Sequence, residues 1–252
     1  MGKMTEEDRL MRRINQRFMK GVMNYKLIEE GDCILVGLSG GKDSLALLEL
    51  LARRSRIYKP KFSVVAAHVV MKNIAYESDQ TYLREYAESL GVPYVCYETE
   101  FDSSTDTRKS PCFLCSWNRR KALFTVAKEQ GCNKIALGHH MDDILETLLM
   151  NMTFQGAFST MPPRLVMRKF DMTIIRPMCL VHEADLKEMA ALRGFRKQVK
   201  NCPYEKDSHR SDMKEVLARL EAMNPEARYS LWGSMNNIQH DMLPVEEDDS
   251  LK

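Results

Sequence analysis

Short apolar runs alternate with helical segments along most of this chain, and no other feature constrains its fold as strongly. The runs predicted to be strands are residues 33–38, 62–70, 92–98, 134–138 and 173–177. Strands buried on both faces appear as continuous apolar runs, and parallel strands need crossover connections, usually helices, between them. The alternation therefore predicts an α/β fold with an open, doubly wound, five-stranded parallel sheet of the Rossmann-like kind.

Helical spacing of apolar residues marks the segments around these strands. Helices are predicted over residues 5–29, from Leu45 onward, and over 78–90, 116–130, 142–155, 182–194 and 208–223, with a last one beginning at Asn224-Pro225. In the first helix, one face is apolar and roughly the opposite one is a basic stripe of Arg9, Arg13, Arg17 and Lys20. We expect an amphipathic basic helix in 1–30, one α/β domain with C-terminal helices in 31–240, and an acidic flexible tail in 241–252.

Composition narrows the class of protein. The chain has 252 residues, of which 44% are hydrophobic, enough to fill a core. No apolar run approaches the ~18 residues of a membrane span, and the charge-rich start lacks the apolar region of a secretory signal, so we expect a cytoplasmic protein without membrane association. A net charge of +2 excludes a uniformly basic nucleic-acid coat and allows a local patch. Clustered cysteines in a reducing compartment favour metal or redox chemistry over disulfides.

A Gly-rich turn follows the first predicted strand and opens a helix. Glycines let backbone approach phosphate oxygens, and a helix N-terminus offers unpaired N–H groups to an anion. The turn matches neither the Walker pattern nor G-x-G-x-x-G. A solvated Gly-Gly turn is the alternative, but the position and the full string favour a nucleotide site. Its candidate residues are Ser39, Gly40, Gly41, Lys42, Asp43 and Ser44. Because a carboxylate repels phosphates, we expect Asp43 to hold Mg²⁺ between them.

A second motif, Gly138 to Thr147, also follows a strand and opens a helix, so it is expected at the same edge of the sheet. Asp142, Asp143 and Glu146 are spaced to form one carboxylate patch on that helix. The alternative is that first-turn acids merely complement the helix dipole. We include Gly138 and His139, with His68 from the strand 62–70, among the candidate nucleotide-binding residues.

Cys112 and Cys115 form a C-x-x-C pair that can bind one metal centre. Cys202 is the one further isolated cysteine in a predicted loop, and three thiolates would leave one iron of a [4Fe–4S] cluster open. Zinc completed by His209 or water, and a redox dithiol, remain alternatives on spacing alone.

The string S-G-G-x-D-S after the first strand resembles the signature of the PP-loop ATP pyrophosphatases. That resemblance implies an adenine nucleotide alpha hydrolase-like fold, and ATP cleavage between the α- and β-phosphates to activate a carbonyl oxygen as its adenylate. It also makes Lys42, Asp43, Asp142 and Asp143 the candidate catalytic residues.

The motif order is similar to that of the tRNA 2-thiocytidine synthetase family, from about Arg12 to Asn237. The order is SGGKDS, C-x-x-C-S-x-x-R-R, GHHMDDILET, Met161-Pro162-Pro163 and the lone Cys202. The resemblance implies that Cys112, Cys115 and Cys202 hold a [4Fe–4S] cluster. Two departures concern the late motif, where Val199 replaces a cysteine and Pro203-Tyr204-Glu205 replaces Gly-Ser-Gln. The chain is also shorter than many members.

The resemblance implies a reaction on tRNA. We expect adenylation of the C2 oxygen of an anticodon-loop cytidine, then replacement of that oxygen by sulfur delivered on the iron–sulfur cluster, with release of AMP and pyrophosphate. Candidate RNA-binding residues are Arg119 and Arg120 beside the cysteines, and Arg13 and Arg17 of the basic stripe, which has a solvated helix face as its alternative. The expected partners are tRNA and a sulfur donor, either a cysteine desulfurase or sulfide, and the family leads us to expect a homodimer. The alternatives are a PP-loop ligase of the tRNA-lysidine synthetase type and an iron–sulfur or sulfur-carrier RNA-binding protein that does not turn over ATP.

Overall fold

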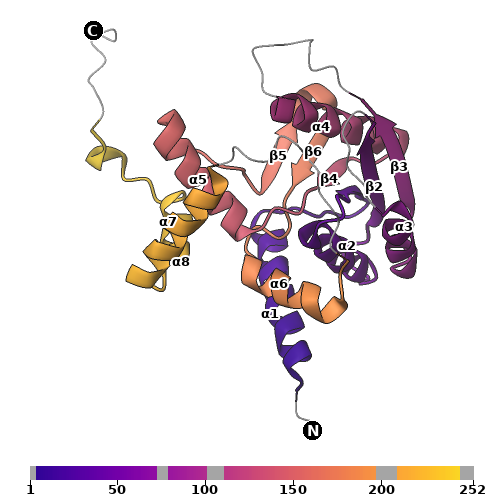
Figure 1. Ribbon diagram of the computed structural model, residues 1–252, viewed down its shortest axis with the longest axis horizontal. Coiled ribbons are helices and arrows are strands. Elements are labelled where there is room, and N and C mark those ends of the chain that lie inside the picture. Colours follow the sequence, from indigo (N-terminus) through magenta and orange to yellow (C-terminus); the bar gives the residue numbers. More distant parts are fainter. Residues whose placement is uncertain (1–3, 73–78, 101–110, 197–208, 245–252) are drawn as a thin grey trace. The chain divides into compact units, whose positions relative to one another are not determined.

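A computed structural model describes the backbone of residues 4–72, 79–100, 111–196 and 209–244, and their side chains except those of 111–113 (Figure 1). The chain divides into two compact units, which are described separately. The first contains Met1–Ile144 and Thr160–Ser208, and the second contains Leu145–Ser159 and His209–Lys252. The domain boundaries near residues 30 and 240 stay predictions from the sequence.

The first unit is built on a six-stranded sheet in the order β3-β2-β1-β4-β6-β5. The five predicted strands are confirmed and pair in parallel: β1 Cys33–Gly37, β2 Ser63–Met71, β3 Tyr94–Thr99, β4 Lys134–Ala136 and β6 Met172–Ile175. The predicted number of strands was wrong, because β5 (Arg164–Met167) adds an antiparallel edge strand beside β6. This strand is only four residues long, so its apolar residues Leu165, Val166 and Met167 form too short a run to mark a strand.

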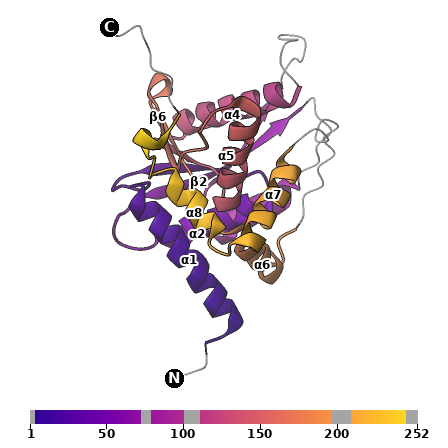
Figure 2. The same cartoon turned by 90° about the vertical axis from the view of Figure 1, so that its left-hand side faces the viewer.

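Alternating residues of the central strands fill two apolar clusters, one on each face of the sheet. Ile34 and Val36 of β1 belong to the first cluster, and Leu35 belongs to the second. The first cluster packs under α1 Glu6–Asn24, α2 Lys42–Ser55, α3 Gln80–Ser89 and α6 Glu183–Arg193. The second packs under α4 Pro111–Glu129, and Figure 2 shows α4 on one side of the strands with α1 and α2 on the other.

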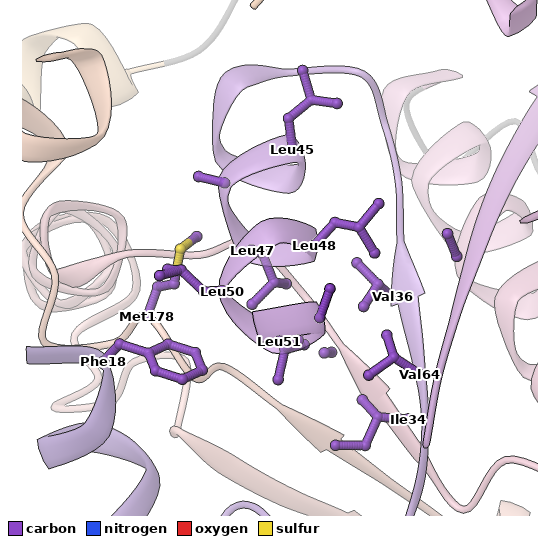
Figure 3. Close-up of a cluster of buried hydrophobic side chains, with 14 of the residues drawn as sticks. Phe18, Ile34, Val36, Leu45, Leu47, Leu48, Leu50, Leu51, Val64 and Met178 are labelled. Carbon is purple, nitrogen blue, oxygen red and sulfur yellow. The ribbon is translucent and has the colours of Figure 1, made fainter. Parts of the chain in front are cut away.

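Helix α2 supplies the densest part of the first cluster. Figure 3 shows Leu48 of this helix beside Val36 of β1, and Leu50 on the side of the helix toward Phe18 and Met178. Phe18 of α1 is completely buried in the same cluster, so the N-terminal helix is part of the core of the first unit. The helix that carries the Gly-rich turn at its start is thereby fixed along its whole length, which gives that turn a rigid support.

Helix α5 (Met141–Gln155) begins in the first unit and continues into the second, which also contains α7 (Arg210–Met223) and α8 (Ala227–Ser234). The last helix was predicted to begin at Asn224-Pro225. The structure corrects this start to Ala227, because Asn224 forms a turn in which its side chain accepts a hydrogen bond from Glu226 N at 3.0 Å. Among the described residues, no helix combines the length and apolar character needed to span a bilayer.

Candidate functional site: a nucleotide site at the carboxyl edge of the sheet

The Gly-rich turn connects the end of β1 to the start of α2. Gly40 adopts φ +82°, a left-handed conformation that glycine reaches without steric cost, and Gly41 is the N-cap residue of α2. Gly41 offers no side chain to cap the helix, so the N–H groups of Lys42 and Asp43 remain available to an anion, while Ser44 N donates to Gly41 O at 3.0 Å. Ser44 Oγ donates to Gly41 O at 2.9 Å and lies 3.2 Å from Ser39 Oγ, which fixes the turn in this shape.

The second motif packs directly on this turn. A Cβ atom at Gly138 would lie 3.1 Å from both Asp43 C and Ser44 N, a distance at which the backbone of α2 would have to shift. Glycine is therefore the residue that lets the strand β4 edge approach the first turn of α2 this closely. The structure thus brings together the two sequence motifs that were predicted to share one edge of the sheet.

His140 lies among three carboxylates drawn from both motifs, and it is only 4% exposed. Its Nε2 is 3.4 Å from Asp143 Oδ2 and 3.9 Å from Asp43 Oδ1, and its Nδ1 is 3.7 Å from Asp142 Oδ2. Asp143 N donates to Nδ1 at 3.3 Å, so Nε2 is the nitrogen left to donate toward the carboxylates. No role for His140 was predicted from the sequence, although its position between Gly138 and Asp142 places it in the same motif.

The two acids of the second motif also have structural bonds. Asp142 Oδ2 accepts a hydrogen bond from Glu183 N at 2.9 Å, at the start of α6, and Asp143 Oδ2 accepts one from His140 N at 3.1 Å. Glu146, expected in the same patch, belongs to the second unit, where Arg210 Nε is 3.9 Å from its Oε2. The carboxylate patch of the first unit therefore contains Asp142 and Asp143. Both also accept backbone N–H groups near the start of a helix, as the helix-dipole alternative predicts.

Lys42 and Asp43 form the charged part of the turn. Lys42 Nζ is 3.0 Å from Asp43 Oδ2 and 3.4 Å from Glu183 Oε1. Glu183 was missed by the sequence analysis, since nothing in a sequence relates position 42 to a residue 141 positions later. Lys42 and Asp43 are both half-buried, so the ammonium of Lys42 can leave its two carboxylates and pair with an arriving anion.

Asp43 Oδ1 is a buried oxygen that has no hydrogen-bond partner among the described residues. A buried carboxylate oxygen without a partner is costly, and a divalent cation would satisfy it. The described residues contain no set of three side chains arranged to hold a metal ion. Mg²⁺ commonly binds through one or two carboxylates together with substrate phosphates and water, so Asp43 fits that role.

His68 supports the turn from the neighbouring strand β2. Its Nδ1 donates to Leu38 O at 2.7 Å, directly before Ser39, and the side chain is 2% exposed. Burial lowers the pKa of His68 below its ordinary value, and the positive charge of Arg119 acts in the same direction, against the hydrogen bond to Leu38. His68 is therefore neutral at pH 7 and fixes the end of β1.

The C-x-x-C pair lies in the first turns of α4, because this helix begins at Pro111 and not near residue 116 as predicted. Cys115 is half-buried, while the side chain of Cys112 and all of Cys202 lie outside the described residues. The convergence of the three predicted ligands therefore stays a prediction. His209, the proposed zinc ligand of the alternative, donates from Nδ1 to Asp212 Oδ2 at 3.1 Å and stacks on Phe154 within the second unit.

The predicted RNA-binding arginines have different surroundings. Arg13 Nε is 2.8 Å from Asp185 Oδ1, and Arg17 forms an ion pair with the other oxygen of this buried carboxylate. These bonds give Arg13 and Arg17 a role in holding α1 on α6, and their RNA contact stays a prediction. Arg119 is half-buried and Arg120 is exposed on α4.

Arg176 is a cation at this edge that the sequence analysis did not single out. It directly follows β6, is 7% exposed, and its Nη1 donates to Pro162 O at 2.6 Å. Its Nε is buried without a partner among the described residues. Burial, with a smaller contribution from the charge of Arg120, lowers the pKa of Arg176 to about 10. A buried guanidinium facing a second cation is an arrangement that an anion would stabilise.

The family that this chain matches supports a nucleotide site at the Gly-rich turn. Residues 7–214 match the family described as the PP-loop domain. The chain is 37% identical over 237 residues to the tRNA-cytidine(32) 2-sulfurtransferase of Syntrophotalea carbinolica, covering 92% of each chain. It is 34% identical to the enzyme of the same name from Shewanella pealeana, covering 97% of this chain and 82% of that one. This chain therefore belongs to the tRNA-cytidine(32) 2-sulfurtransferase family.

Among solved structures, the fold is similar to that of the U34-tRNA thiolase NcsA from Methanococcus maripaludis, determined with its [4Fe-4S] cluster. The TM-score is 0.72 at 23% sequence identity, and the match covers 91% of this chain and 78% of that one. At this identity the likeness concerns the fold, and it confirms the α/β architecture.

Proposed function

We propose that this protein is an ATP-dependent tRNA sulfurtransferase that converts cytidine 32 of the anticodon loop into 2-thiocytidine. Membership of the family across nearly the whole chain supports this reaction, as does the name that its relatives carry. The structural observation that carries the proposal is the contact of Gly138 with the backbone of Asp43 and Ser44. That contact joins the Gly-rich turn of residues 39–44 (the phosphate turn) and the second motif (the acidic motif) in a single site. The site lies at the carboxyl edge of the sheet, where open α/β sheets bind ligands.

The first step activates the base. The C2 oxygen of cytidine attacks the α-phosphate of ATP, and pyrophosphate departs, because oxygen leaves poorly as hydroxide and well as AMP. The N–H groups at the start of α2, with Ser39 and Ser44, bind the phosphates. Lys42 moves from Asp43 and Glu183 to the departing pyrophosphate and matches its charge. Asp43 would hold Mg²⁺, which would supply positive charge to neutralise the phosphates.

The second step replaces the oxygen by sulfur, and AMP is released. Cys112, Cys115 and Cys202 would hold a [4Fe–4S] cluster that supplies the sulfur atom for C2. Cys115 is the fifth residue of α4 and is half-buried. A cysteine desulfurase or free sulfide would renew the sulfur.

Binding of tRNA requires cations around the carboxyl edge. Arg119, Arg120 and Arg176 can neutralise phosphates of a single-stranded loop whose base is turned into the site. Arg13 and Arg17 contribute to RNA binding only if they exchange Asp185 for phosphate. A homodimer through the N-terminal helix is part of the proposal. The apolar face of α1 is buried within its own unit, so the dimer contact would use exposed residues of this helix, such as Met23.

Nucleoside mass spectrometry of tRNA tests the function. Cells that lack this protein should lose 2-thiocytidine, and the wild-type gene should restore it. Asp43→Asn should fail to restore it, while Glu85→Gln, which changes an exposed carboxylate on α3, should succeed. An unchanged 2-thiocytidine content in the deletion strain would refute the assigned substrate.

A further inference from the structure

Two cysteines outside the nucleotide site lie in direct contact. Cys33 Sγ and Cys132 Sγ are 2.8 Å apart, closer than non-bonded sulfur atoms ordinarily approach. Cys33 is the first residue of β1, and Cys132 lies two positions before β4 begins. These two strands are neighbours at the centre of the sheet, with Ile34 opposite Lys134. The contact therefore joins the amino ends of the two strands whose carboxyl ends carry the site motifs.

The backbone around the two cysteines is fixed by hydrogen bonds. Cys33 N donates to Asn133 Oδ1 at 2.9 Å, and Asn133 N donates to Cys33 O at 3.1 Å. Both sulfur atoms lie 4.0 Å from the same carbonyl oxygen, Gln130 O. The sulfurs need to approach by less than about 1 Å to reach the bonded distance of about 2.05 Å, so the sheet can hold a bond between them without a change of register.

We propose that Cys33 and Cys132 form a reversible intramolecular disulfide when the protein meets a peroxide. In the first step, the Cys33 thiolate attacks a peroxide oxygen of H₂O₂, giving a sulfenic acid and hydroxide, which takes up a proton. In the second, the Cys132 sulfur attacks the Cys33 sulfur, the S–S bond forms, and water leaves with the oxygen and the thiol proton. Two thiols lose two electrons and two protons in total, and H₂O₂ becomes two molecules of water.

The burial of the two thiols sets the order of these steps. Cys132 is 5% exposed, whereas Cys33 is half-buried and accessible to a small oxidant. Burial raises the pKa of the Cys132 thiol, so Cys132 is the poorer nucleophile toward peroxide. Cys132 is the resolving thiol because its sulfur is held 2.8 Å from that of Cys33. Cys96, by comparison, donates to Gln80 Oε1 at 3.4 Å.

The disulfide would close a long loop. The two residues are 99 positions apart, and the segment between them contains the phosphate turn and helices α2, α3 and α4. A bond across such a loop restricts the unfolded chain and stabilises the folded one. The bond lies at the opposite edge of the sheet from the nucleotide site, roughly 20 Å away along β1. It would therefore strengthen the strands that support the site without touching its residues.

Peptide mapping of the full-length protein tests this proposal. The protein is treated with a stoichiometric amount of H₂O₂, remaining thiols are alkylated, and the digest is analysed without reduction. We expect a cross-linked species that joins the peptides of Cys33 and Cys132, is two hydrogen atoms lighter than their sum, and disappears on treatment with dithiothreitol. Recovery of both cysteines as alkylated thiols, or their linkage to other cysteines, would overturn the proposal.

Variants separate this bond from other oxidation. Oxidation should raise the Tm of the wild-type protein by on the order of 5 °C, and Cys33→Ser and Cys132→Ser should abolish that rise. Cys96→Ser, which removes a thiol outside the pair, should keep both the rise and the cross-link. Because the mapping uses the wild-type chain, a folding defect in a variant leaves the test intact. A rise in Tm that persists in Cys33→Ser would contradict the assignment.

Discussion

Gly138 packs against the backbone of Asp43, at a distance where a Cβ atom would lie 3.1 Å from the carbonyl carbon. The two residues belong to different motifs, 95 positions apart in the chain. Their contact decides how closely the acidic motif approaches the phosphate turn. The geometry of the whole nucleotide site therefore depends on the absence of one methyl group.

We expect Gly138→Ala to displace the first turn of α2. Its Cβ meets backbone atoms, which cannot rotate away, so the substitution should cost about 1–3 kcal/mol of unfolding free energy. Because the turn moves with the helix, affinity for ATP should fall at least about tenfold. Denaturant unfolding and nucleotide titration measure the two effects.

Gly233→Ala is the matched control, because the new Cβ would meet no atom within 4 Å and the residue lies in helix α8. It should leave ATP affinity unchanged and stability equal or slightly higher. Equal ATP affinity in the wild-type protein and Gly138→Ala would show that the contact does not shape the site.

Titration of His68 should make stability depend on pH. The pKa of His68 is lowered in the folded protein, so below about pH 6.5 the unfolded chain binds a proton that the folded one does not. Stability should be full above that pH and fall as the pH drops toward the folded pKa. Urea unfolding between about pH 5 and 8 measures the slope.

His68→Asn offers the comparison, because its amide can still donate to Leu38 O but does not titrate. The variant should lose less stability than the wild-type protein over the same pH interval. Identical pH dependence of the two proteins would mean that His68 contributes nothing to it.

Much of the fold was predictable from the sequence because four of the five parallel strands, all except the edge strand β3, are largely buried and form continuous apolar runs. The antiparallel β5 was not, since its four residues lie at the sheet edge with half-exposed side chains. The true start of α4 had a signal that we did not use: proline is favoured at the first position of a helix, and Pro111 occupies it.

Half of the candidate site was predictable for a similar reason. The phosphate turn and the acidic motif each follow a strand, and parallel strands end at one edge of the sheet. His140 lies inside the acidic motif and could have been singled out there. Glu183 and Arg176 act through contacts with residues far away in the chain or through burial. No local pattern encodes such contacts, and they emerge only from the fold.

Asp185 should be important for the attachment of α1. This carboxylate is 6% exposed and pairs with Arg13 and Arg17, so its removal leaves two cations without their buried partner. We expect Asp185→Ala to cost about 2 kcal/mol in the free energy of unfolding. Glu188→Ala removes an exposed partner of Arg13 and should change it by less than about 0.5 kcal/mol. Equal effects of the two substitutions would contradict the role of burial.

Arg176 should matter more for activity than for stability. Burying its charge is costly, as its pKa of about 10 shows, and replacement of a buried charge by an apolar side chain of similar length often costs little. Arg176→Met should therefore change the free energy of unfolding by less than about 1 kcal/mol. Thiolation of tRNA should fall at least about tenfold, because a phosphate of the bound RNA loses a charged hydrogen-bond donor.

Arg164→Met, at the edge strand β5, is a suitable control, because it removes an exposed arginine from the same unit. It should retain thiolation. If Arg176→Met unfolded the protein but left the thiolation rate of the folded fraction unchanged, Arg176 would be a structural residue.

Substitution of the predicted cluster ligands separates thiolation from ligation. Cys112→Ala and Cys202→Ala should each lose iron and the absorbance of the cluster when purified without oxygen, and tRNA thiolation should be abolished. Both variants should still bind ATP, since the phosphate turn belongs to β1 and α2 and not to the cysteine segments. Cys96→Ala should keep iron and activity. A PP-loop ligase would tolerate all three substitutions, so full activity of Cys112→Ala would favour that alternative. A sulfur carrier that does not turn over ATP would lose iron in Cys112→Ala and Cys202→Ala, but its Asp43→Asn variant would work normally.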